Sequence, residues 1–488
     1  MAVAFLMLTA VSVSGIQAQE TDSLRKISGT VTDHSGASLP GVSIIVKGTS
    51  TGIVSDMNGK YSLSVPIGVW LVFSYVGMAT QERIVIEQII DVVMDEGVKM
   101  EPAKPVDLTI KQSEKVEADN GFAFQMFREV SKVEGSNTFF SPFSLNMALG
   151  MLYNGSSGNT RSEMVKTLGL ANFSETEINE YYQTMLHALL EIDPSTDMVI
   201  ANSIWYRNIL PVKGSFVKTG KKYFDADVQA LDFSNSGAAN MINKWCADKT
   251  RNRITNIVAN PVPNDVMMYL INALYFKSKW DMDKKFDKEK TKLDDFTKTD
   301  GEKIKAYLME QATSLPYYAD QHLQCVEMPY GNQAFSMIAI LPPEDMNINQ
   351  LIAYLDHIKL KNAVSSMQQQ MVWLKLPRFK IECDFSLNQP LMNLGMKQIF
   401  DRKAAKFANI ADTVLYVSNI KQKTFVEVNE EGTEAAAVTA ITIMAFGRAR
   451  RTPIEPMRFF ADRPFLFLIR EKSTGVILFI GRIDEPHE

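Results

Sequence analysis

This chain has little cysteine. Its 488 residues contain three, Cys246, Cys325 and Cys383, which stand far apart and without Cys-x-x-Cys spacing. A disulfide scaffold and a cysteine-based zinc site are therefore excluded, because both need several thiols in close pairs. We expect each of the three side chains to be buried as a small hydrophobic group.

Histidine is scarce as well, and the motifs of common enzyme classes are missing. None of the five histidines stands at the His-x-x-x-His or His-Glu-x-x-His spacing of a metalloprotease. The chain has no Gly-x-Ser-x-Gly nucleophile elbow, and no Gly-Lys-Ser/Thr motif follows Gly155 and Gly158. Glu430 and Glu431 are adjacent carboxylates, but neighbours in an extended chain point to opposite faces and do not form a glycosidase pair. The sequence therefore predicts no enzyme, no catalytic residue, no metal site and no cofactor.

Excess charge and long apolar runs are also lacking. A net charge of −5, with 46% hydrophobic and 22% charged residues, is typical of a soluble globular protein and gives no reason to expect nucleic acid or an anionic membrane as a partner. The start is the exception, since residues 1–16 are uncharged and mostly apolar and Ala18 is a candidate cleavage site. We expect a signal peptide over residues 1–19, although no Lys or Arg precedes the apolar run, and no transmembrane span elsewhere. The chain is expected to be exported, to the periplasm, the cell surface or the extracellular space.

Residues 25–97 carry a pattern of strands and turns. Short β-rich runs such as "ISGTVTD", "GVSIIVKG", "YSLSVP" and "VWLVFSYVG" predict a small all-β sandwich of about seven antiparallel strands. Asn58-Gly59, between two such runs, is a hairpin signal. The succession "GTVTDHSGASLPGVSIIVKGTSTGIVSDMNGKYSLSV" resembles the carboxypeptidase-regulatory-like domain. The resemblance implies an adaptor without catalytic groups, which would contact a partner in the cell envelope.

Residues 98–112 read "VKMEPAKPVDLTIKQ", and their two prolines and mixed charges predict a linker. A second domain is expected over residues 113–488. In "EKVEADNGFAFQMFREVSKVEG" the apolar residues Val116, Phe127 and Val130 share one helical stripe with Val133, and Gly135 ends it.

Two further helix starts are expected in this domain. Ser141 is a candidate N-cap with Pro142 at the first helical position, and Thr160 with Glu163 fits a capping box. The runs "INALYFKSKW", "VWLKLPRFKI", "PFLFLI" and "GVILFIG" then predict long strands. The pattern indicates a mixed α+β domain with a large sheet.

The stretch "NEEGTEAAAVTAITIMAF", residues 429–446, fits neither a plain helix nor a plain strand. Its alanines favour a helix, whereas the Val, Ile and Thr residues in its second half favour a strand. After Glu434 it carries no charge. A segment with both tendencies is suited to change its conformation.

The second domain resembles the serpin family over its whole length. The resemblance rests on six blocks in order: "NTFFSPFSLNMALGMLYNGSSGNTRSEM", "INALYFKSKW", "VEMPYGN", "LKLPRFKI", "FVEVNEEGTEAAAVT" and "DRPFLFLIREKSTGVILFIGRI". It implies an α+β serpin fold with a large mixed sheet, helices and an exposed reactive loop. It also implies a monomeric inhibitor that acts as a suicide substrate. A target serine protease cleaves the loop and becomes acylated, and the loop then inserts into the sheet as an extra strand and traps the protease covalently.

The resemblance assigns the hinge of that loop to residues around the alanine run. These are Glu430, Gly432, Thr433, Glu434, Ala435, Ala436 and Ala437. From Thr433 the odd positions are small or apolar through Ile443, as a strand that buries every second residue requires, while Glu434 would face solvent. Bulky, charged or proline residues in the hinge are common in non-inhibitory relatives. Their absence favours an inhibitor over the alternative, a non-inhibitory serpin-fold binding protein.

Further residues match structural supports of sheet opening in the family. Ser141, Ser144 and Asn272 match a polar cluster beneath the opening point, and Trp280 matches an aromatic residue where insertion begins. Gln422 stands where many relatives have a histidine in the strand before the hinge. An amide both donates and accepts hydrogen bonds, so we expect altered gating with function retained.

The cleaved bond follows from counting along the loop. The seventeenth residue, counted inclusively from Glu430, is Phe446, which gives the bond Phe446-Gly447 and a chymotrypsin-like or elastase-like target. The alternatives are Arg448, Arg450 and Arg451, which would suit a trypsin-like protease. The segment after Gly447 is longer than in compact family members, so the arginines stay open as cleavage sites.

Overall fold

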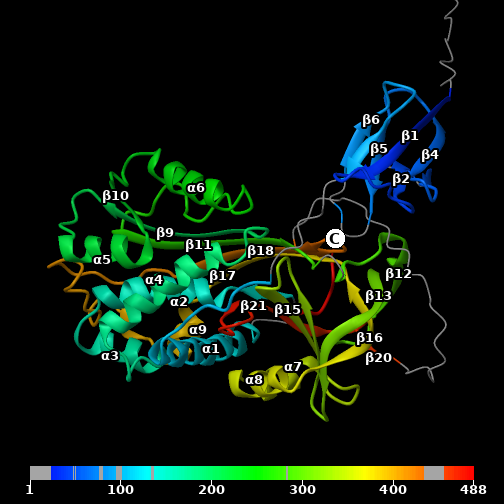
Figure 1. Ribbon diagram of the computed structural model, residues 1–488. Coiled ribbons are helices and arrows are strands. Elements are labelled where there is room, and N and C mark those ends of the chain that lie inside the picture. Colours follow the sequence, from blue (N-terminus) through cyan, green and yellow to red (C-terminus); the bar gives the residue numbers. More distant parts are fainter. Residues whose placement is uncertain are drawn as a thin grey trace, which may run out of the picture. The chain divides into compact units, whose positions relative to one another are not determined.

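The computed structural model describes residues 24–47, 49, 51–75, 78, 81–94, 102–132, 137–281, 284–433 and 456–487. The chain divides into two compact units, Met1–Met100 and Glu101–Glu488, and each is described by itself (Figure 1). Among the helices of the described ranges, none is long and apolar enough to cross a bilayer.

The N-terminal unit is a β-sandwich, as the sequence predicts. Its strands are β1 (Arg25–Asp33), β2 (Ser43–Val46), β3 (Gly52–Val54), β4 (Lys60–Val65), β5 (Trp70–Ser74), β6 (Gln81–Ile84) and β7 (Val92–Met94). They form a three-stranded sheet in the order β4-β1-β7 and a four-stranded sheet in the order β3-β2-β5-β6. Ile27, Val31, Ile44, Leu71 and Phe73 are fully buried between them. The expectation of purely antiparallel pairing is wrong at one place, because β1 and β7 run parallel.

The Asn58-Gly59 turn forms, but it does not close a hairpin. Gly59 has φ +72°, and the Asp56 carboxylate accepts hydrogen bonds from the backbone N–H groups of Asn58 and Lys60, both at 2.8 Å. The strands on either side belong to different sheets, since β3 pairs with β2 and β4 pairs with β1. The turn therefore carries the chain from one layer of the sandwich to the other.

The C-terminal unit combines helices with two large sheets. The helices are α1 (Ile110–Val130), α2 (Pro142–Gly155), α3 (Gly158–Thr167), α4 (Glu175–Glu191), α5 (Gly214–Phe224), α6 (Ala238–Lys249), α7 (Ile348–Tyr354), α8 (His357–Ser365) and α9 (Asn388–Asn393), with 3-10 turns η2 (Lys288–Lys290) and η3 (Gln398–Phe400). The predicted stripe of α1 is confirmed for Val116, Phe127 and Val130, which are buried. The helix ends at Val130, earlier than predicted, and Val133 and Gly135 lie outside the described residues. The helix begins earlier than expected, inside the segment assigned to the linker, because Thr109 caps it with a reciprocal capping box to Gln112.

The first sheet has six strands and holds the candidate site. Its order is β10 (Asp227–Leu231), β9 (Asp197–Arg207), β11 (Met268–Lys279), β19 (Gly432–Thr433), β18 (Lys421–Asn429) and β17 (Phe379–Ser386). Figure 1 shows β9, β11, β17 and β18 side by side, with α6 over one face and α2 under the other.

The second sheet has nine strands. Its order is β20 (Met457–Phe460), β16 (Gln368–Pro377), β13 (Lys303–Ala319), β14 (Gln324–Pro329), β15 (Phe335–Leu341), β21 (Phe465–Glu471), β22 (Ile477–Ile483) and β8 (Thr138–Phe140), with β12 (Lys292–Thr297) paired to β13. The two sheets share one hydrophobic core with the helices. The expected α+β architecture is therefore confirmed.

Helix α2 is the centre of this core. Ser141 caps it through a hydrogen bond from the Ser144 N–H and Pro142 opens it, as predicted. Every residue of α2 except Ala148 is buried, because the helix contacts β11 of the first sheet and β22 of the second. It therefore serves as a fixed floor beneath the first sheet.

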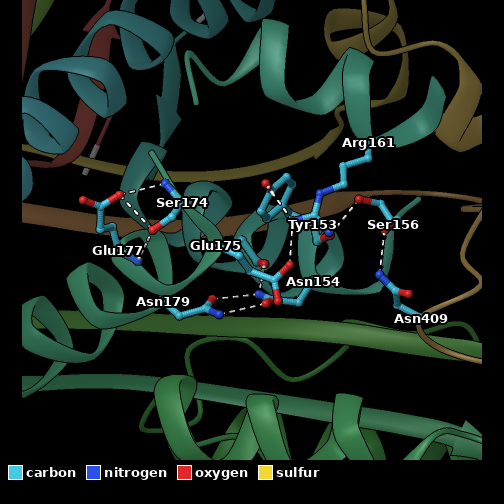
Figure 2. A network of polar contacts seen from close by, with 10 residues as sticks. Tyr153, Asn154, Ser156, Arg161, Ser174, Glu175, Glu177, Asn179 and Asn409 are labelled. Atoms are coloured by element: carbon cyan, nitrogen blue, oxygen red, sulfur yellow. Dashed lines mark hydrogen bonds and ion pairs between the residues drawn. The ribbon is translucent and has the colours of Figure 1, made fainter. Parts of the chain in front are cut away.

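The helices around α2 are held by polar contacts (Figure 2). Asn154 and Asn179 exchange two hydrogen bonds of 2.8 Å, which join α2 to α4. Arg161 donates to the Tyr153 hydroxyl at 2.9 Å and contacts Glu175 at 2.5 Å. The asparagine pair is buried, and a buried, fully paired polar contact favours a single arrangement of the helices.

The expected capping box of Thr160 and Glu163 is wrong. Helix α3 begins at Gly158, so Thr160 lies inside it and is fully buried. The Thr160 hydroxyl accepts a hydrogen bond from the backbone N–H of Lys406 at 3.0 Å. The Glu163 carboxylate accepts hydrogen bonds from the backbone N–H groups of Lys397 and Gln398 at the start of η3. Both side chains bind a distant segment, which the local pattern did not indicate.

Candidate functional site: the hinge and the slot in the six-stranded sheet

The hinge enters the six-stranded sheet as a short strand. In β19, Gly432 pairs with Lys279 of β11 and Asn429 of β18, while Thr433 pairs with Ser278 and Val428. Both ladders are antiparallel. Two residues of the hinge therefore already occupy the position between β11 and β18.

Gly432 is required at this position by close packing. Its φ is +146°, and a Cβ atom there would lie 2.2 Å from the carbonyl oxygen of Ser278. No side chain fits in that space, and L-residues other than glycine rarely adopt this backbone conformation. The glycine thus lets the hinge approach β11.

Thr433 points into the protein and is held by a tyrosine. The Tyr330 hydroxyl and the Thr433 Oγ1 lie 2.6 Å apart, and both residues are buried. Burial raises the pKa of Tyr330 well above its ordinary value despite the hydrogen bond to Thr433, so the phenol stays protonated. The sequence assigned no role to Tyr330, although it lies within the "VEMPYGN" block.

Trp280 lies beside this contact. Its ring stacks on that of Tyr330 with centroids 4.5 Å apart. Its indole N–H donates to the carbonyl of Asn429 at 2.9 Å, and its backbone N–H donates to the carbonyl of Glu431, also at 2.9 Å. The structure therefore places Trp280 against the chain just before β19.

The two hinge carboxylates are buried among cations. Glu430 Oε1 accepts a hydrogen bond from Arg378 Nε at 2.8 Å and another from the Thr291 hydroxyl. Burial raises the pKa of Glu430, but the hydrogen bonds from Arg378 and Thr291 outweigh it, and the net pKa is lowered. The Glu431 carboxylate lies 3.7 Å from Lys285 Nζ and 3.5 Å from Lys288 Nζ.

Below β19 the sheet is open. Over their described lengths, β11 and β18 pair with β19 and not with each other. A cavity of about 640 Å³ lies there, and residues 268–274 of β11 and 421–424 of β18 line it. The floor is α2, through residues such as Leu145 and Leu149. We call this cavity the slot.

Ser141, Ser144, Asn272 and Gln422, which the resemblance named as supports, all line the slot. The Gln422 amide exchanges two hydrogen bonds of 2.9 Å with the backbone of Ser141, and the Ser144 N–H donates to Ser141 Oγ at 3.1 Å. Asn272 is not part of that cluster, because its amide donates to Asn202 at 2.7 Å. Its buried Oδ1 receives no hydrogen bond from the described residues.

The remaining predicted residues of the loop lie outside the described residues. These are Glu434, Ala435, Ala436, Ala437, Phe446, Gly447, Arg448, Arg450 and Arg451. The cleaved bond stays a prediction.

All three cysteines are buried and free, as expected. Within the described ranges no group of three or more His, Cys, Asp or Glu side chains is placed to hold a metal ion.

The site thus consists of a two-residue strand, β19, between β11 and β18, and a cavity below it that both strands line. The chain matches the family model "Serpin (serine protease inhibitor)" over residues 117–486 and the "CarboxypepD_reg-like domain" over residues 27–101. The chain therefore belongs to the serpin family, whose members are generally inhibitors of serine proteases rather than catalysts.

Similar proteins come from animals and from thermophiles. Iripin-3 of Ixodes ricinus is 33% identical over 75% of this chain and 93% of its own length, and Serpin B6 of Pongo abelii is 32% identical over 76% and 99%. The native structure of tengpin, a thermophilic serpin, shares 30% identity and a TM-score of 0.71 over 80% of this chain and 97% of its own. Thyroxine-binding globulin in complex with thyroxine shares 27% identity and a TM-score of 0.68 over 77% and 100%.

Proposed function

We propose that this protein inhibits serine-type endopeptidases as a suicide substrate, by inserting its cleaved loop into the slot. The observation that carries the proposal is the register of β19. Thr433 pairs with Ser278 and Val428, and both ladders are antiparallel. A strand that continued this register would run down the slot between β11 and β18.

The continued register matches the loop residues to the slot. Each step along the loop moves the pairing one residue back on both strands, so Ala437 falls opposite Leu274 and Ile443 opposite Met268. These are the residues of β11 that line the slot. Thr433 faces the interior, and side chains in a strand alternate. The small and apolar odd positions of the loop would therefore cover α2, and Glu434 would face solvent.

Thr439 is the polar member of this odd series within the slot. By the same register it falls opposite Asn272 on β11 and opposite Gln422 on β18. Asn272 Oδ1 is the buried acceptor without a hydrogen bond from the described residues, and the threonine hydroxyl is a donor that suits it. The Thr439 hydroxyl would thus meet the polar part of the slot.

Insertion would release free energy. Each new ladder hydrogen bond contributes about 0.5–1.5 kcal/mol, so a dozen would release on the order of ten kcal/mol. That is comparable to the whole stability of a typical domain. The uncleaved protein would be metastable, which is the condition for trapping a protease before the acyl-enzyme hydrolyses.

The target and the location are part of the proposal. We place the cleaved bond at Phe446-Gly447, which suits a chymotrypsin-like or elastase-like protease. Residues 1–19 would direct export to the periplasm, the cell surface or the exterior. The N-terminal sandwich would act as an adaptor to an envelope partner. The match of residues 27–101 to the CarboxypepD_reg-like model supports the adaptor role.

The test mixes the full chain with chymotrypsin, elastase and trypsin. We expect an SDS-stable complex larger than either component, and a released C-terminal peptide that starts at Gly447 by mass spectrometry. A complex together with a peptide that starts after an arginine would support the same mechanism with cleavage at that arginine. Cleavage without a complex, and without a rise in thermal stability afterwards, would show a non-inhibitory serpin-fold binding protein instead.

A matched pair of hinge variants sharpens this test. Ala435→Arg puts a charge on the odd, inward series, so we expect cleavage without trapping. Ala436→Arg puts the same charge on the outward series, so we expect trapping to persist. Equal behaviour of the two variants would contradict insertion in the register of β19.

A further inference from the structure

The segment between the two family matches is docked on the C-terminal unit. Residues 102–116 lie outside both matches, which end at residue 101 and begin at residue 117. We call residues 102–109 the strap. The Ala103 N–H donates to the carbonyl of Asn332 at 3.1 Å, and the Val106 N–H donates to Ser473 Oγ at 2.9 Å. Ala103 and Leu108 also pack against the hydrophobic core.

The strap binds a well-satisfied turn. Asn332 is 8% exposed, and both ends of its side-chain amide are hydrogen-bonded to residues other than the strap. Its side chain donates to the carbonyl of Ile192 at 2.8 Å and accepts from the Ala334 N–H at 3.0 Å. Its own carbonyl takes the Ala103 N–H. The strap therefore adds one backbone hydrogen bond to the turn at residues 330–334.

The hinge binds the other end of the same turn. Tyr330 is its first residue, and its hydroxyl contacts Thr433 at 2.6 Å. The turn is closed by a hydrogen bond of 2.6 Å from the Gln333 N–H to the Tyr330 carbonyl. Asn332 and Tyr330 are thus two residues apart in one tight turn, so the strap and the hinge contact the same short segment.

We propose that the strap is a positioning element for the hinge. It holds the turn at residues 330–334 in the form that receives Thr433, so strap and hinge each favour the binding of the other. Such coupling is reciprocal. Release of the strap then weakens the contact between Thr433 and Tyr330, and it slows loop insertion relative to hydrolysis of the acyl-enzyme. This consequence rests on the proposed inhibitory function, whereas the coupling itself does not.

The test is hydrogen exchange by mass spectrometry on the full chain. Ala103→Pro/Val106→Pro removes both strap hydrogen bonds, because proline has no N–H. We expect exchange at the turn and at residues 430–433 to rise on the order of five-fold or more. The control Lys104→Ala/Asp107→Ala changes exposed strap residues and should leave exchange unchanged. Each single proline variant is measured too, so that a folding defect in the double variant does not decide the result.

A second readout is the number of inhibitor molecules consumed per protease trapped, which should rise in the proline variants only. Strap amides that exchange freely in the wild type, or proline variants with unchanged exchange at the turn and hinge, would overturn the proposal. Because exchange needs no protease, this result is separate from the fate of the inhibitory function. A wild type that traps protease while the variants show unchanged exchange would keep the function and reject the strap.

Discussion

The side-chain amide of Gln422 and the backbone of Ser141 exchange two hydrogen bonds, one in each direction, both 2.9 Å long. This pair joins β18 to the N-cap residue of α2 at the wall of the slot. The two residues are 281 positions apart in the chain. The edge of the open sheet is therefore fastened to the helix that forms its floor.

Gln422→Ala is expected to loosen this edge. The Ser141 N–H is buried and would lose its partner, which costs about 1–3 kcal/mol. The Ser141 carbonyl keeps a bond from the Leu145 N–H, so the loss falls mainly on the donor. Urea unfolding measures the change. Lys421→Ala on the same strand is the control, since its pair with Asp384 is exposed and should change stability by less than about 1 kcal/mol. Equal losses in the two variants would contradict the role of the amide.

Thr439→Val tests the proposed register inside the slot. The variant keeps the shape of the side chain and removes the hydroxyl that would meet Asn272 and Gln422. We expect the stability gained on loop cleavage to fall by about 1–3 kcal/mol, because the buried Asn272 Oδ1 would stay without a hydrogen bond. Thermal unfolding before and after cleavage measures this gain. Thr442→Val lies in the outward series and should leave it unchanged; a larger effect there would refute the register.

The ion pair of Glu430 predicts a dependence of stability on pH. The pKa of Glu430 in the folded state lies below the ordinary value of 4.5. The stabilisation of the folded state by ionised Glu430 is therefore complete above pH 4.5, and it is lost as the pH falls through the lower pKa of the folded state. Arg378→Gln should cost about 2 kcal/mol at neutral pH and flatten the loss of stability below pH 4.5. Urea unfolding between neutral and acid pH measures both. Parallel curves for variant and wild type would show that another group causes the acid loss.

A buried ion pair within α1, whose lysine also contacts α4, predicts a different response. Lys115 and Asp119 form an ion pair, both side chains are at most 4% exposed, and Lys115 Nζ also contacts the Tyr182 hydroxyl at 3.2 Å. Lys115→Met leaves Asp119 as an uncompensated buried charge and should destabilise the fold by about 3–5 kcal/mol.

The double variant Lys115→Met/Asp119→Leu is the informative control for that pair. Replacing both partners by apolar groups of similar size is often neutral or stabilising, so most of the loss should be recovered. Urea unfolding of the single and double variants gives the coupling energy. A double variant as unstable as the single one would show that Lys115 acts through its contacts with the tyrosines.

Several features could be read from local sequence because their causes are local. Ser141 caps α2 and Pro142 opens it, since capping depends on a few neighbouring residues. The stripe of Val116, Phe127 and Val130 is buried because helical periodicity alone decides which residues share a face. The two family resemblances are confirmed, and they rest on long ordered blocks.

Other features depended on partners far along the chain and were missed for that reason. Thr160 and Glu163 have the pattern of a capping box, but both bind the segment around η3 instead. The Asn58-Gly59 turn has the expected chemistry, yet the strands beside it pair in different sheets. Tyr330 and Asn202, which contact Thr433 and Asn272, carry no local signal at all.

By itself, the sequence determined the composition of a segment able to become a strand. The sequence alone shows Gly432, the uncharged odd positions and the single charge at Glu434. They indicate a strand with one buried face, because side chains point to alternate faces in any extended chain. Only the tertiary structure decided that a place for the strand exists. The slot lies between β11 and β18, which are about 150 residues apart in the sequence, and its floor is α2, from a third part of the chain. Contacts between such distant segments leave no pattern in the local sequence, so the sequence alone could not show them.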